Sequence, residues 1–139
     1  MKGFVLTDRE RAVVAYQAIG LSITRIAFLV GRSRETVRDH LERARIKAGA
    51  SNAAHLIHAV YRFQALPLPD PEPRTFPVTV EQQRGLELVA QGCTGRGAAQ
   101  RLDISHGQFE AEIRRLRTLM KANSRAHMVS RGWALRLLE

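Results

Sequence analysis

The residues whose types and spacing best suit binding chemistry lie at the start of an expected helix that follows Ser33. Arg34, Glu35 and Arg38 share one face of that helix, opposite the apolar position Val37. A guanidinium one turn into such a helix can donate to guanine O6 and N7 together, and it also suits phosphate oxygens. The chemistry predicted for this face is recognition of nucleic acid, with the three polar side chains facing bases.

Further basic and hydroxyl side chains in the same region can donate to backbone phosphates. Such contacts fix the position of a protein on a duplex without reading its sequence. The candidates for this role are Ser22, Arg25, Thr36, Arg43 and Arg45.

The overall charge agrees with an anionic partner. The chain has 139 residues and a net charge of +9, and all but three of its 22 basic residues are arginine. Residues 1–66 carry +6, residues 67–77 carry −1 and residues 78–139 carry +4. This balance favours nucleic acid over a membrane surface, although an arginine-rich usage is also typical of a GC-rich genome.

Other functional classes find little support in the residues. A single cysteine, Cys93, excludes an internal disulfide framework. His55 and His58 lie three apart on one expected helix, but neither cysteine nor a carboxylate set accompanies them, so we expect no metal and no cofactor. The acidic residues show no paired arrangement typical of catalysis, and we expect no enzyme. Without a signal peptide or a long apolar run, we expect a cytoplasmic, nucleoid-associated protein of a bacterium or phage, with no membrane contact.

Helices must position these groups, because capping residues followed by apolar positions at helical spacing recur throughout and no period-two alternation is present. We therefore predict an all-α fold with four helices in each half. In the first half they are expected from Thr7 to Gly20, from Ser22 to Val30, from Ser33 to Gly49 and over about 52–63; in the second half they follow Thr79, Thr94 and Ser105, and a last helix carries Met128, Val129, Trp133, Leu135 and Leu138.

A proline-rich segment separates the halves. All five prolines lie between Pro67 and Pro77, and proline prevents a helix from continuing through the segment. We expect a domain at residues 1–66, a semi-rigid spacer of roughly 30 Å at residues 67–77 and a second domain at residues 78–139. The alternative is a loop packed on one globule.

The halves are related by an internal repeat. A shift of 72 residues aligns ten identical pairs over about 58 positions, including Gly20 with Gly92 and His55 with His127. Because the identities fall where helices begin, turn or pack, we interpret the second half as a copy of the first.

The first half resembles the LuxR/GerE-type helix-turn-helix family of bacterial transcription regulators. The resemblance covers residues 6 to about 63 and implies that the helix after Ser33 lies in the major groove of double-stranded DNA. The matching motifs are Leu6-Thr7-x-Arg9-Glu10, Gly20-x-Ser22-x-x-x-Ile26-Ala27, Gly31-x-Ser33-x-x-Thr36-Val37-Arg38-x-His40 and Lys47-x-Gly49.

The second half looks like a diverged copy of this domain, so the predicted fold is two tandem four-helix helix-turn-helix domains. Glu110 stands where the first half has Arg38, and this inversion opposes binding to a polyanion. The second face therefore contacts DNA, or it serves dimerisation or a partner such as RNA polymerase. Its candidate residues are His106, Gln108, Glu110, Arg114 and Arg125.

The resemblance implies a sequence-specific DNA-binding transcription regulator, and with six residues before Thr7 we expect it to lack a sensor domain. Relatives commonly dimerise through their fourth helix, so we expect either a homodimer or an internal pseudo-dimer of the two halves. The alternative function is a protein-binding adaptor that contacts a transcription factor or RNA polymerase. Trp133 could belong to such a contact, although its helical spacing with leucines is more typical of a core.

Overall fold

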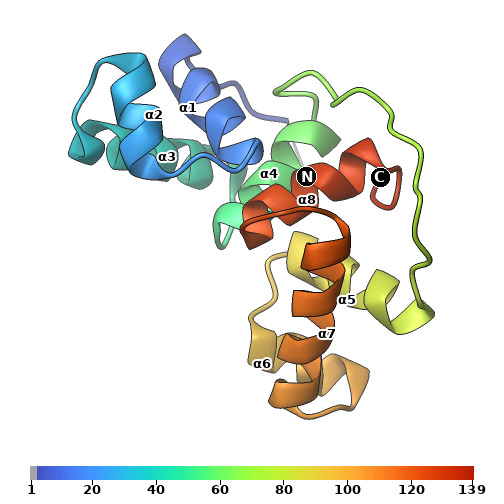
Figure 1. Cartoon of the computed structure of the whole chain (residues 1–139). Coiled ribbons are helices and arrows are strands. Elements are labelled where there is room, and N and C mark those ends of the chain that lie inside the picture. The colour runs from blue at the N-terminus through green and yellow to red at the C-terminus, as the bar shows by residue number, and fades with distance from the viewer. Residues whose placement is uncertain (1–2) are drawn as a thin grey trace.

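The computed structural model describes residues 3–139, which fold into helices without a strand (Figure 1). The predicted all-α class is confirmed. Within this range no helix is long and apolar enough to cross a membrane. The helices are α1 (Asp8–Ala18), α2 (Ile23–Val30), α3 (Arg34–Ala48), α4 (Ala53–Arg62), α5 (Val80–Ala90), α6 (Gly95–Leu102), α7 (His106–Leu119) and α8 (Arg125–Ala134).

Short-range hydrogen bonds set the helix starts. The Thr7 hydroxyl accepts from the Glu10 backbone N–H at 3.1 Å, and the Glu10 carboxylate accepts from the Thr7 N–H at 3.0 Å. Thr79 and Gln82 form the same capping box at α5. Both boxes were expected from the sequence, since each satisfies two N–H groups that a helix start leaves free.

The structure repeats along the chain with a constant offset. Each of the first four helices begins 72 positions before its counterpart in the second half. Residues with positive φ also recur in pairs that are 72 positions apart. In one of these pairs both residues are glycine. These pairs are Gly20 with Gly92, Gly31 with Asp103, Gly49 with Lys121, and Gln64 with Arg136.

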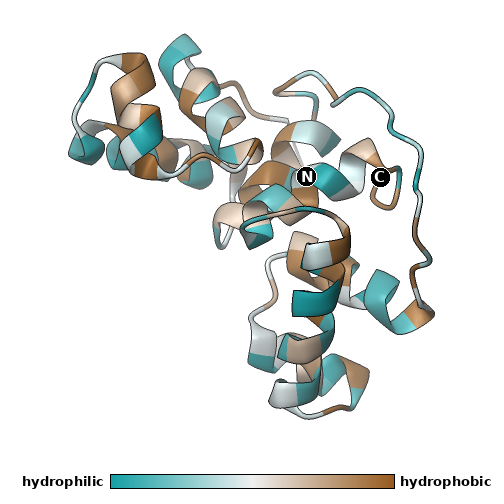
Figure 2. Cartoon of the chain, viewed as in Figure 1, coloured by the Kyte–Doolittle hydropathy of each residue, from teal (hydrophilic) through white to brown (hydrophobic). Residues whose placement is uncertain are grey.

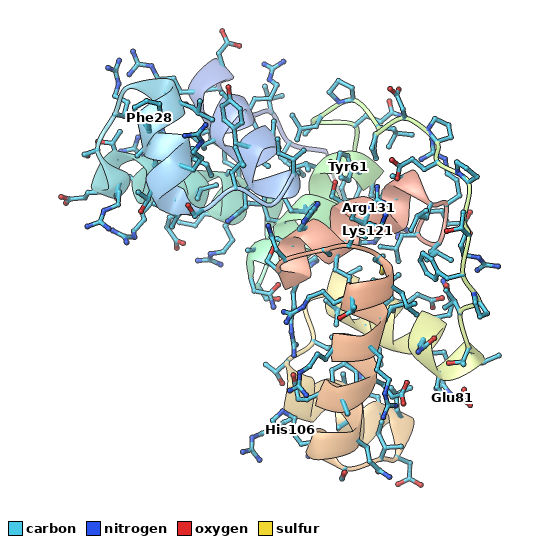
Figure 3. All side chains as sticks on the ribbon, viewed as in Figure 1. Phe28, Tyr61, Glu81, His106, Lys121 and Arg131 are labelled. Carbon is cyan, nitrogen blue, oxygen red and sulfur yellow. The ribbon has the colours of Figure 1, made fainter. Side chains whose placement is uncertain are left out.

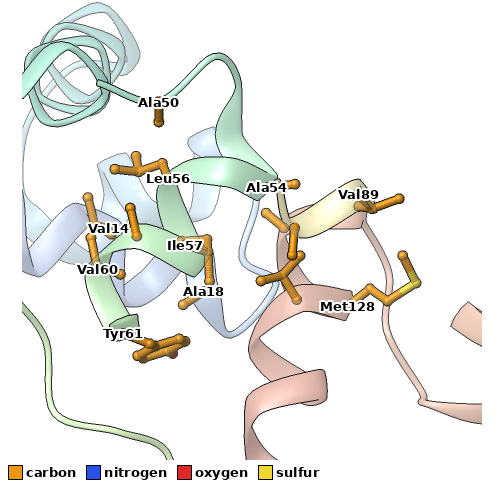
Figure 4. Packing of buried hydrophobic residues seen from close by; sticks show 14 of the residues in the cluster. Val14, Ala18, Ala50, Ala54, Leu56, Ile57, Val60, Tyr61, Val89 and Met128 are labelled. Atoms are coloured by element: carbon orange, nitrogen blue, oxygen red, sulfur yellow. The ribbon is translucent and has the colours of Figure 1, made fainter. Parts of the chain in front are cut away.

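The fourth helix of each half lies at the centre of the molecule. In Figure 1, α4 packs beside α8, whereas α1–α3 and α5–α7 lie at opposite ends. Figure 4 shows the apolar side chains of this centre, among them Ile57 of α4 and Met128 of α8, which are fully buried. The hydropathy colouring of Figure 2 places hydrophilic residues on much of the outer helix surface. Burial of apolar area therefore joins the two halves into one core.

Two hydrogen bonds cross this interface. The Trp133 indole Nε1 donates to His58 Nδ1 at 3.0 Å, and the hydroxyls of Tyr61 and Ser130 are 3.0 Å apart. Ser130 occupies the position equivalent to His58, and Trp133 the position equivalent to Tyr61. If the two halves are interchanged, the His58–Trp133 contact falls on the Ser130–Tyr61 contact. This is the behaviour expected of a two-fold relation between the halves.

The turns at the ends of α1 and α5 make a second exchanged pair of contacts. Asn123 Nδ2 donates to the Gly20 carbonyl at 2.9 Å. In the other direction, the Ser51 hydroxyl, at the position equivalent to Asn123, donates to the Gly92 carbonyl at 3.2 Å, and the neighbouring Asn52 Nδ2 donates to the same carbonyl at 3.1 Å. A Cβ atom at Gly20 would lie 2.6 Å from His127 Nδ1, so this close approach requires glycine as well as its positive φ.

The proline-rich segment runs along the second half. The Glu72 N–H donates to the Ala134 carbonyl at 2.8 Å, and the Glu72 carboxylate pairs with Arg131. Phe76 is half-buried against the core. The segment is therefore held against α8 rather than projecting as a free spacer, because its backbone and its acidic side chain find partners there.

The buried His58 makes the stability of the fold depend on pH. Burial, followed by the positive charges of Arg62 and His55, lowers the pKa of His58 from 6.5 to about 4. The unfolded chain therefore binds a proton below pH 6.5 that the folded chain does not, so stability is lost as the pH falls from 6.5 toward 4. From pH 7 to pH 5 this linkage removes roughly 2 kcal/mol from the free energy of unfolding.

Urea unfolding at the two pH values measures this loss, with His58→Gln as the control. The glutamine amide oxygen can still accept from Trp133, but it does not titrate. We expect the variant to lose clearly less stability than the wild type over this range. Equal losses in the two proteins would show that His58 does not carry the effect.

Candidate nucleic-acid interface

The helix pair α2 and α3 is set by its own caps. The Ser22 hydroxyl accepts from the Arg25 N–H at 3.2 Å, and the Ser33 hydroxyl accepts from the Thr36 N–H at 3.1 Å. Between the helices, Gly31 ends α2 with φ of 66°, a left-handed conformation that glycine adopts at low cost. A short helix, a tight turn and a longer capped helix constitute a helix-turn-helix unit.

The two faces of α3 differ sharply. Val37 and Ala44 are fully buried, and Leu41 is 9% exposed. Arg34, Glu35 and Arg38, the predicted base-reading residues, are all exposed on the other side. Within residues 3–139 these three side chains form no ion pair. The face is charged, open and available to a ligand.

Three predicted phosphate ligands lie near the N-terminal ends of α2 and α3. Ser22 and Arg25 are exposed, and the Arg25 guanidinium lies 5.5 Å from the centroid of the exposed Phe28 ring. The Thr36 hydroxyl oxygen accepts from Ser33 at 3.0 Å, which leaves its own O–H free to donate. Phe28 marks this end of the molecule in Figure 3.

The two remaining predicted phosphate ligands lie farther along α3 and differ from each other. Arg43 is exposed. Arg45 is half-buried, donates to Glu42 at 2.5 and 3.0 Å, and donates to the Ala50 carbonyl at 2.7 Å. The Arg45 guanidinium therefore ties the C-terminal part of α3 to the turn before α4.

A groove connects the reading face of α3 with the junction of the two halves. One hollow is bordered by Arg38 and Glu42 of α3, and it shares Gln17, Ile23 and Ala53 with a larger cavity of about 650 Å³. The larger cavity also touches the second half. The residues that line it there are Val89, Cys93, Thr94, Asn123, Ser124, Arg125 and Ala126.

The predicted second face is less open than the first. Arg114 and His106 are exposed, and Figure 3 places His106 at the end of the molecule far from Phe28. Gln108 accepts from the Ser105 N–H at 2.9 Å and so completes the cap of α7. Glu110 and Arg125 are bound to each other. Four of the five candidates therefore have partners within their own half, because His106 also contacts Glu110 at 3.3 Å.

The family comparison identifies the first half. The model of the GerE family, described as bacterial regulatory proteins of the luxR family, matches residues 4–60. Residues 4–60 form a luxR-family helix-turn-helix domain. The match spans α1 to α3 and most of α4, which confirms the resemblance of the first half. No curated protein and no solved structure matches the chain.

The luxR-family domain meets the second half through residues that the sequence did not single out. Ser51, Asn52 and Asn123 bind the glycine turns of the opposite half. The available signal was the recurrence of Gly20 at Gly92 and of His55 at His127. Such recurrence indicates that these residues pack against something, but it does not show that each glycine turn contacts the opposite half.

Proposed function

We propose that the chain is a sequence-specific, non-enzymatic transcription regulator that places α3 in the major groove of double-stranded DNA. The observation that carries this proposal is the asymmetry of α3, with an apolar face in the core and Arg34, Glu35 and Arg38 exposed. An exposed helix with such side chains in its first turns fits the width of the major groove. In this arrangement Arg38 donates to a guanine.

The phosphate contacts supply affinity and fix the register. Ser22, Arg25 and Arg43 are exposed and Thr36 is half-buried, and each side chain has a donor for a phosphate oxygen of the DNA backbone. Arg45 contributes charge while its guanidinium supports the turn after α3. The net charge of +9 favours association with a polyanion.

Arg43→Ala is expected to weaken binding to all duplexes similarly. Arg43 is exposed on α3 and we assign it to a phosphate, so its loss removes one counterion-releasing contact. The slope of log K against log salt should become shallower by about 0.9. Fluorescence anisotropy over a range of salt concentrations, on two duplexes of unrelated sequence, measures both quantities.

Arg115→Ala is the matched control for this measurement. Arg115 occupies the position equivalent to Arg43 on α7 and pairs with Glu112. Its removal should leave the salt slope within error of the wild-type value. A slope that is unchanged by Arg43→Ala, or changed equally by both substitutions, would contradict the assignment of Arg43 to a phosphate.

We further propose that residues 78–139 are a diverged second copy of the domain and that α4 and α8 form an internal pseudo-dimer. The common offset of the helix starts and the recurring positive-φ positions support the copy. The exchanged contacts of His58 with Trp133 and of Tyr61 with Ser130 support the pseudo-dimer. The central surface of α4 is then covered by α8, which argues against a homodimer through the same surface.

A protein-binding adaptor is the second candidate function. The ion pair of Glu110 with Arg125 favours it, because it reduces the charge that the second half offers to DNA. Trp133 does not support it, since the indole is 7% exposed and belongs to the core. Recovery of a stoichiometric transcription factor or polymerase without nucleic acid, together with no affinity for duplex DNA, would favour the adaptor over the regulator.

A further inference from the structure

A closed ion pair occupies the second half at the position where the first half presents Arg38. Arg125 Nη2 donates to both carboxylate oxygens of Glu110, at 2.6 and 2.7 Å. His106 Nε2 lies 3.3 Å from the same carboxylate. The hydrogen bond from Arg125 lowers the pKa of the Glu110 carboxyl against the opposing effect of burial, and His106 adds to the lowering. The carboxylate therefore remains charged at neutral pH.

Three further exchanges between the halves accompany this carboxylate. At equivalent positions, Ile23 becomes Gly95, Arg34 becomes His106, and Ala53 becomes Arg125. Each of the three second-half residues suits the carboxylate. Arg125 and His106 contact it, and Gly95 has no side chain to occupy its space.

The glycine is required by the available space. A Cβ atom at Gly95 would lie 2.2 Å from Glu110 Oε1 and 2.9 Å from His106 Nε2. The carboxylate therefore lies against the first residue of α6, where free backbone N–H groups and the helix dipole favour negative charge. In the first half the equivalent helix start is that of α2, which we assign to a DNA phosphate through Ser22.

Arg125 is well placed to contact DNA when it is released. It is the first residue of α8 and lines the large cavity that continues to the reading face of α3. A duplex held by α3 and extending over this groove would bring phosphates toward Arg125. In the folded chain the guanidinium is instead directed to Glu110.

We propose that the Glu110 carboxylate is an intramolecular anion that prevents the second half from binding DNA through α7, the helix equivalent to α3. Arg125 and His106 bind this carboxylate, and Gly95 leaves room for it. This inference rests on the proposed function, since it takes α3 as the DNA-reading helix. The chain then reads DNA with the first half alone. The second half serves as the permanent packing partner of α4.

Glu110→Gln tests the proposal as a gain of binding. The amide removes the negative charge and releases Arg125, so affinity for a mixed-sequence duplex of about 30 base pairs should rise about three- to tenfold at ~0.1 M salt. The slope of log K against log salt should steepen by about 0.9. Glu110→Ala serves as a second variant, and circular dichroism verifies that each protein is folded.

The controls separate the effect of the Glu110–Arg125 ion pair from a general effect of net charge. Glu112→Gln makes the same charge change on α7, but Glu112 faces Gln82 of α5 and pairs with Arg115. It should change affinity less than twofold, because the added charge lies away from the duplex. The double variant with Glu110→Gln and Arg125→Ala should lose the gain.

The outcomes decide the proposal independently of the proposed function. Equal changes in DNA affinity for Glu110→Gln and Glu112→Gln would overturn the proposal. A gain in affinity that persists in the double variant without Arg125 would also overturn it. Failure of the proposed function would be seen elsewhere, as DNA binding that is unaffected by substitutions on α3.

Discussion

Arg38→Ala is expected to lower the affinity of the chain for its preferred duplex by about 5- to 150-fold, the equivalent of about 1–3 kcal/mol. The expected reason is the loss of a bidentate guanidinium contact to guanine, made from the exposed face of α3. The loss should be concentrated on duplexes with the preferred base at one position. Competition binding against duplexes changed at each position in turn measures both the size and the location of the effect.

Arg9→Ala is a suitable control for this substitution. Arg9 is exposed on α1 and carries the same charge, but it lies outside the reading face. It should reduce affinity less than twofold, through the net charge alone. If Arg38→Ala and Arg43→Ala both weaken all sequences uniformly, Arg38 contacts phosphate and the assignment of direct base reading is wrong.

Trp133→Ala is expected to destabilise the whole chain by about 3–5 kcal/mol. The indole is 7% exposed, packs against Tyr61 at a centroid distance of 5.8 Å and donates to His58. Its removal leaves a cavity between α4 and α8 and an acceptor without its donor. Urea unfolding followed by circular dichroism measures the loss.

Two comparisons separate the contributions of the tryptophan. Trp133→Phe keeps an aromatic ring but lacks the indole N–H, so we expect a smaller loss of about 1–3 kcal/mol. Ile46→Ala removes an apolar side chain that is 64% exposed and should cost about 0.5 kcal/mol or less. A Trp133→Ala protein as stable as the wild type would contradict the joint core.

Solution mass tests the same interface without a substitution. With α8 on α4, light scattering should give a wild-type mass near 15.6 kDa. A mass of twice this value would mean that the chain also forms a homodimer.

The sequence predicted the features that depend on neighbouring residues. Thr7, Ser22 and Ser33 were recognised as caps because each contacts an N–H only three residues ahead. The reading face of α3 followed from the spacing of Val37 and Leu41, which decides which side is buried. These contacts are contained within one helix and its first turn.

The features that depend on distant residues were beyond such reasoning. His58 and Trp133 are 75 positions apart, so their hydrogen bond requires the packing of α4 on α8. The alignment exposed the change from Arg38 to Glu110, but the partnership with Arg125 requires the start of α8 to lie beside α7. The bond of Arg45 to the Ala50 carbonyl likewise depends on the path of the turn after α3, so it could not be predicted from the sequence.

Selection from random duplex DNA with the intact chain at ~0.15 M salt would decide whether α3 reads DNA sequence. We predict enrichment of one short site containing a guanine, with the enriched base losing its preference in Arg38→Ala. Enrichment of no site, with binding that vanishes as salt rises, would mean that the charge of the chain supplies non-specific affinity alone and that α3 does not read sequence.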